Sequence, residues 1–156
     1  MKKLIICIIA LTLLSCGTSK TIQQSKKVIK GEWLVNTITF SESGSFNVTL
    51  FKDTSAACFE GSNWQFISNN NTGTYTINNE NCPTGIRHFI FTIEDIDSTT
   101  GFQSFLLKPT NEKNKSETNQ GFRLQLTQLS ESSMQWQQTI SLEGKPFKIN
   151  MNFSKK

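Results

Sequence analysis

Most of the chain after residue 30 consists of short segments in which apolar and polar side chains alternate. The clearest segment is the last one, where Phe147, Ile149, Met151 and Phe153 alternate with polar residues. A period of two is typical of a β-strand with one buried face. The same or a similar pattern occurs in residues 31–40, 46–52, 64–68, 74–78, 86–96, 102–107, 122–127 and 134–140. The pattern therefore predicts about nine strands.

Turn-forming residues separate these segments, and no helical stripe longer than two turns is evident after residue 15. Phe51 breaks the alternation of residues 46–52 and predicts a bulge or a buried second face there. Residues 52–57 and 110–121 are predicted loops. Short, regularly spaced strands without intervening helices indicate an antiparallel meander, closed into a barrel or folded as a sandwich. We expect an all-β, up-and-down β-barrel of about eight or nine strands in residues 31–156, because closure removes exposed sheet edges.

The first fifteen residues are typical of an export signal. Lys2 and Lys3 precede an apolar run in residues 4–14, which is too short to span a bilayer as a helix. The residues Leu13-Leu14-Ser15-Cys16 look like a bacterial lipobox, which implies cleavage after Ser15 and a lipid anchor on Cys16. The alternative is an ordinary secretory signal that happens to be followed by a cysteine.

Residues 16–30 are polar and carry four lysines without an acidic residue, so we interpret them as a lipidated tether. The tether would let the folded domain stand off a membrane, and its lysines would favour anionic head groups. The alternative is a solvated linker. Gly17 is not the aspartate that marks inner-membrane retention in many lipoproteins. The expected location is therefore the cell envelope, at the outer membrane and facing the periplasm.

Two of the four cysteines remain once Cys7 is removed with the signal and Cys16 carries lipid. Cys58 and Cys82 are then an even pair in an oxidising compartment, which favours a disulfide. The competing use is metal binding. A structural zinc site normally takes four ligands, and two thiols with a single histidine do not match it.

Charge and composition exclude several classes of function. Loss of Lys2 and Lys3 leaves 14 basic residues against 12 acidic ones, so the net charge falls from +4 to +2. This balance lacks the basic footprint of a nucleic-acid-binding protein. His88 is the only histidine, and no nucleophile, base and orienting acid can be assembled around it. We therefore expect no enzyme, no cofactor and no metal site, and nothing in the chain indicates an oligomer.

The lipobox, the opening Gly31-Glu32-Trp33 and the meander together resemble the bacterial lipocalin-like lipoproteins. This resemblance implies that Gly31 and Trp33 form the floor of a barrel and that a late arginine packs over the tryptophan. Arg123 is the candidate for that arginine. The stretch from Cys58 to Cys82 is also similar to the middle of this group, whereas the Thr-Asp-Tyr motif of true lipocalins is missing.

An eight-stranded barrel either fills with side chains or keeps space for one small ligand. Both alternatives are open for this sequence. The first hypothesis is a membrane-anchored lipoprotein that binds or sequesters a small apolar ligand. The alternative is a non-catalytic envelope module, an inhibitor or structural lipoprotein with a filled core, that contacts a protein through loops such as residues 110–121. The candidate ligand-binding residues are Phe46, Trp64, Phe66, Tyr75, Phe89, Phe91, Phe105, Phe122 and Trp136.

Overall fold

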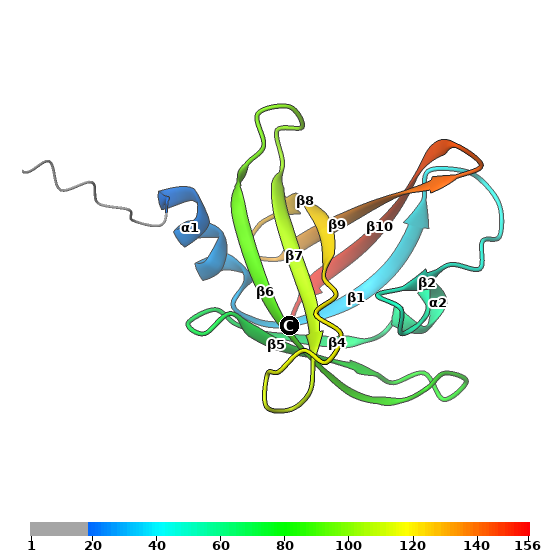
Figure 1. Ribbon diagram of the computed structural model, residues 1–156, viewed down its shortest axis with the longest axis horizontal. Coiled ribbons are helices and arrows are strands. Elements are labelled where there is room, and N and C mark those ends of the chain that lie inside the picture. The colour runs from blue at the N-terminus through cyan, green and yellow to red at the C-terminus, as the bar shows by residue number, and fades with distance from the viewer. Residues whose placement is uncertain (1–18) are drawn as a thin grey trace, which may run out of the picture.

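Eight antiparallel strands follow one another around a closed barrel in the computed structural model, which describes residues 19–156 (Figure 1). Each barrel strand pairs with its sequence neighbours, and the first strand closes the barrel by pairing with the last. This arrangement confirms the predicted all-β up-and-down barrel. The barrel strands are β1 (Gly31–Phe40), β4 (Asn63–Ile67), β5 (Thr72–Ile77), β6 (Gly85–Ile96), β7 (Gln103–Thr110), β8 (Phe122–Leu129), β9 (Ser133–Leu142) and β10 (Lys145–Lys155).

The alternation of side chains decides which face of each strand points inward. In β10 the four apolar residues at alternate positions are buried, whereas Lys148 between them is exposed. Strand β6 is apolar on both faces in the sequence, and the structure places Phe89, Phe91 and Ile93 inside. The two isoleucines at the ends of β6, Ile86 and Ile96, are exposed. The core therefore lies within the barrel.

One end of the barrel is covered by helix α1 (Lys20–Ile29), which falls within the segment expected to be a tether (Figure 1). The side chain of Ser19 caps the helix by accepting a hydrogen bond from the backbone N–H of Ile22 at 3.3 Å. Val28 and Ile29 are buried against the barrel. The folded unit thus begins before residue 31. The predicted signal peptide and the predicted anchor residue Cys16 lie outside the described residues.

Trp33 joins α1 to the barrel floor. Its indole N–H donates to the carbonyl of Ile29 at 2.7 Å, and its ring is fully buried. The ammonium of Lys155 lies 5.2 Å from the centroid of the Trp33 ring and donates to the carbonyl of Val28 at 2.7 Å. The candidate Arg123 was wrong for this role: it points outward from β8 and pairs with Glu94. A lysine on the last strand makes the cation–π contact instead.

The opposite end of the barrel is covered by residues 49–59, which we call the plug. The plug contains β2 (Thr49–Leu50), β3 (Thr54–Ser55) and the short helix α2 (Ala56–Phe59). Strand and loop were predicted for this region, but the structure forms a tight hairpin with Phe51 at φ 53° and Lys52 at φ 54°. Phe51 and Phe59 are buried at the barrel mouth. Side chains of the plug therefore continue the core beyond the strands.

Candidate functional site

The barrel interior, the predicted ligand site, is occupied by aromatic rings that contact one another. At its centre the Trp136 ring lies 4.5 Å from Phe105 and 5.3 Å from Trp64, measured between ring centroids. Phe66 lies 5.8 Å from Trp136. These separations fall within the favourable range for stacked and edge-to-face pairs. All four side chains are at most 1% exposed. The centre of the barrel is thus filled by its own side chains.

Seven of the nine candidate ligand-binding residues lie inside the barrel, and the other two lie at its mouth. The ring centroid of Phe122 lies 5.5 Å from that of Phe51 in the plug, and the ring centroid of Phe46 lies 4.8 Å from that of Phe147. Sequence reasoning did not include Phe51, Phe59 and Phe153 among the interior aromatics. The alternation of β10 could have identified Phe153. Phe51 and Phe59 lie outside the barrel strands, so the alternation within those strands could not identify them.

Gly73 makes room for one of these rings on the inner face of β5. A Cβ atom at this position would lie 2.3 Å from Cζ of Phe89 and 2.6 Å from the carbonyl oxygen of Gln65. Phe89 is the cross-strand partner of Gly73. The ring of Phe89 therefore occupies space that any other residue at position 73 would fill, which is a common reason for glycine within a strand.

The indole N–H groups of the three tryptophans differ in their hydrogen bonding. Trp33 donates to a backbone carbonyl of α1, and Trp64 donates to the hydroxyl of Ser62 at 2.9 Å. The buried indole nitrogen of Trp136 has no hydrogen-bond partner among the described residues. An unpaired buried donor destabilises a fold by about 1–3 kcal/mol. The packing of the Trp136 ring must offset this cost.

Hollows large enough for a small molecule lie on the outer surface of the described residues. One, of about 220 Å³, is bordered by Glu32, Gln65 and Thr74 on the outside of the barrel. Another, of about 320 Å³, lies between α1 and the strands β6 to β8 and is bordered by Val28 and Phe102. The first hollow is also bordered by Trp64 and the second by Leu126, and both of these side chains are buried.

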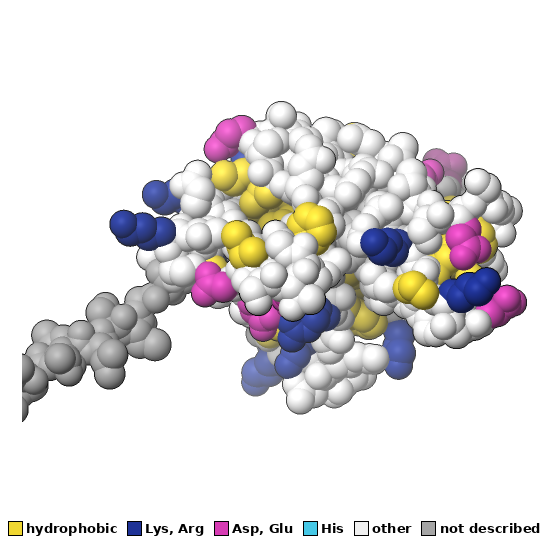
Figure 2. Space-filling model, turned by 90° about the horizontal axis from the view of Figure 1, so that it is seen from above, with side chains coloured by type: hydrophobic (Ala, Val, Ile, Leu, Met, Phe, Trp, Pro, Cys, Tyr) yellow, Lys and Arg dark blue, Asp and Glu magenta, His cyan; other side chains and the backbone are white. Residues whose placement is uncertain are grey.

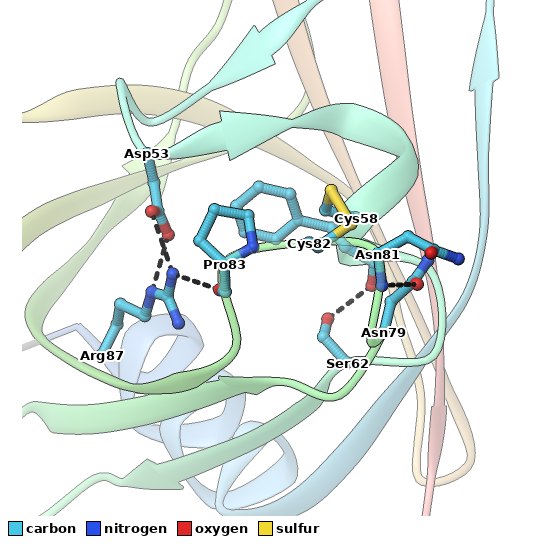
Figure 3. The surroundings of a disulfide bond; sticks show 9 residues. Asp53, Cys58, Ser62, Asn79, Asn81, Cys82, Pro83 and Arg87 are labelled. Carbon is cyan, nitrogen blue, oxygen red and sulfur yellow. Dashed lines mark hydrogen bonds and ion pairs between the residues drawn. A yellow bond between two sulfur atoms is a disulfide. The ribbon is translucent and has the colours of Figure 1, made fainter.

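A disulfide and an ion pair fasten the plug to the barrel wall (Figure 3). Cys58 of α2 is bonded to Cys82 in the loop after β5, which confirms the predicted disulfide over a metal site. The guanidinium of Arg87 donates to both carboxylate oxygens of Asp53, at 3.0 and 3.3 Å. Arg87 also donates to the carbonyl of Pro83 at 2.6 Å. The plug is thus fixed to the rim by a covalent link and by a charged network.

Tyr75 connects this network to the interior, because its hydroxyl donates to Asp53 at 2.9 Å. Burial of the phenol raises the pKa of Tyr75 above its ordinary value of 10.0, and the negative charge of Asp53 raises it further. The folded state therefore favours the protonated phenol. This contribution to stability is complete below pH 10 and is lost as the pH rises above it.

Alkaline titration tests this arrangement directly, since Tyr75 is the only tyrosine in the chain. We expect no tyrosinate absorbance in the native protein as the pH passes about 10, and a signal only when the protein unfolds. The Tyr75→Phe variant should lose less stability above that pH than the parent protein. Reversible ionisation at pH 10 while the far-ultraviolet circular dichroism stays native would contradict the buried, hydrogen-bonded position of the phenol.

Eight strands in simple sequence order, closed antiparallel, form the up-and-down barrel of the lipocalins. Lipocalins share this architecture with other eight-stranded barrels. The sequence matches no protein-family model and no curated protein. Among solved structures it is similar to a lipocalin-like protein from Bacteroides uniformis ATCC 8492, with 11% identity and a TM-score of 0.49. The similarity covers 82% of this chain and 98% of that one.

Neither helix of residues 19–156 has the length and apolar character needed to cross a membrane.

Proposed function

We propose that the chain is a lipid-anchored, non-catalytic binding module of the cell envelope that engages its partner through its outer surface. The observation that supports this proposal is the filled interior, in which Trp64, Phe105 and Trp136 occupy the centre. Both ends are also covered, one by α1 and the other by the plug. The module is proposed to act as a monomer and without a cofactor.

A second candidate function is the binding of one small apolar ligand beneath the plug. Its support is the strained turn at Phe51, whose positive φ is a genuine outlier for a bulky residue. Such strain persists only where the surrounding structure holds it in place. Displacement of the plug would remove Phe51 and Phe59 from Trp64 and Tyr75, leaving an apolar surface at the mouth.

Fluorescence titration with palmitate and oleate distinguishes the two candidates. We expect no saturable quenching of the buried tryptophans in the oxidised protein, because no ring at the centre can be displaced without loss of packing. Saturable, equimolar quenching of the oxidised protein would contradict the surface proposal. The matched control is the same protein after reduction of the Cys58–Cys82 bond. Binding that occurs only after reduction would support the second candidate.

The lipid anchor has a separate test in cells. Replacing Cys16 by Ser removes the proposed site of acylation, and several acyl chains contribute about 0.8 kcal/mol for each buried methylene. We therefore expect the Cys16→Ser chain to move from the membrane fraction to the soluble fraction. Cys7→Ser is the control, since that residue lies within the proposed signal peptide.

A further inference from the structure

Exposed apolar side chains gather at the end of the barrel that α1 covers. Ile96 is 53% exposed and Phe102 is 37% exposed, and they lie on either side of the turn between β6 and β7. The hollow of about 320 Å³ beside them is also bordered by Val28 and Leu129. We call Ile96, Phe102 and the apolar border of this hollow the anchor-side patch. Figure 2 shows hydrophobic side chains grouped on this part of the surface, near the start of the described chain.

The described chain begins next to this patch. The hydroxyl of Ser19 donates to the carboxylate of Asp95, the residue before Ile96. Residue 16 precedes Ser19 by three positions, and three residues span at most about 11 Å even when fully extended. A lipid on Cys16 would therefore enter the bilayer close to Ile96 and Phe102. The opposite end, which carries the plug, would be directed away.

Charge at this end is mixed. Helix α1 presents Lys20, Lys26 and Lys27 and has no acidic residue in its first turn. Asp95 and Asp97 lie on or beside the end of β6 and offset part of that positive charge. Attraction to anionic head groups is consequently reduced. Apolar contact with the bilayer interface adds a second favourable term for this surface.

We propose that the anchor-side patch rests on the bilayer surface and orients the barrel with its plug facing away from the membrane. This inference rests on the lipid anchor of the proposed function, because the anchor brings this end to the bilayer. The proposed binding partner of the patch is therefore a lipid surface. The plug end and the barrel sides then remain free for the partner.

Vesicle co-sedimentation tests the contact without the anchor. The protein is the chain from residue 16 with Cys16→Ser, which retains every described residue, and the vesicles contain equal parts of phosphatidylethanolamine and phosphatidylglycerol. We expect weak but measurable partition, reduced about tenfold by Ile96→Ser with Phe102→Ser, which corresponds to about 1.4 kcal/mol. Ile86→Ser is the matched control, since Ile86 is 65% exposed at the opposite end of the same strand.

Equal partition of the parent, the double variant and the control would overturn the proposed contact. Circular dichroism and an intact disulfide in each variant establish that the fold is unchanged, which is expected because both replaced side chains are exposed. A different experiment tests the lipid anchor itself. If Cys16→Ser combined with Ile96→Ser and Phe102→Ser stays in the membrane fraction of cells, the lipid anchor is wrong, whatever the vesicles show.

Discussion

Replacing Trp136 by Ala should lower the free energy of unfolding by about 4 kcal/mol, the middle of the range for aromatic-to-alanine changes in cores. The ring of Trp136 stacks on Phe105 and lies edge-on to Trp64. Removing it leaves a cavity among neighbours that are themselves fully packed and cannot all move inward. Urea denaturation, monitored by circular dichroism, measures the change.

The same variant also tests whether the interior is filled. A cavity lined by apolar rings stays dry and can bind a small apolar molecule such as benzene. We expect benzene to stabilise Trp136→Ala and to leave the parent protein unaffected. Ile86→Ala is the control, because this side chain is largely exposed and its removal creates no cavity. If Trp136→Ala is as stable as Ile86→Ala, the centre of the barrel is not packed as described.

Loss of the Cys58–Cys82 disulfide is the second large effect. The two cysteines are 24 positions apart, and the chain-entropy model gives about 3.5 kcal/mol for a loop of this length. The double variant Cys58→Ser with Cys82→Ser should be destabilised by that amount. It should also bind a hydrophobic dye more strongly, because the plug then has no covalent link and is held only by ring packing and by the contacts of Asp53 with Arg87 and Tyr75. Denaturation of the variant beside the oxidised parent provides the measurement.

A matched variant separates the disulfide from the charged network. Asp53→Asn keeps both cysteines and breaks the ion pair, whose side chains are each 21% exposed. Partly exposed pairs contribute about 1 kcal/mol or less. We therefore expect a much smaller loss of stability for Asp53→Asn than for the cysteine variant. A similar loss in both would show that the network fastens the plug as strongly as the covalent link does.

Those features of the fold that depend on local pattern could be predicted from the sequence. Alternation in β10 and in the β4–β5 hairpin directly encodes which side chains face inward, so the strands and their burial agree with the prediction. The disulfide followed from counting the cysteines left after export. Gly31 and Trp33 were placed at the barrel floor by resemblance alone, and the structure shows that the Trp33 side chain is buried.

Features that depend on distant parts of the chain could not be predicted in this way. Helix α1 is ten residues long, and its buried face becomes apparent only when the barrel end is present to cover it. The positive φ of Phe51 is held by contacts with Phe59 and Phe122, which lie far apart in the sequence. Lys155 meets Trp33 because β10 is the neighbour of β1, and no local pattern marks that pairing.

That pairing also determines when the protein can fold. Strand β1 lies between β4 and β10, and its Trp33 is aligned with Lys155 of β10. The last strand of the barrel therefore supplies one whole side of the first. Pairing of two such distant strands is slow, because the entropy of closing the chain between them is lost before the contacts form. Until β10 is synthesised, β1 and β9 remain open edges, and a chain truncated before that strand would be prone to pair with other chains.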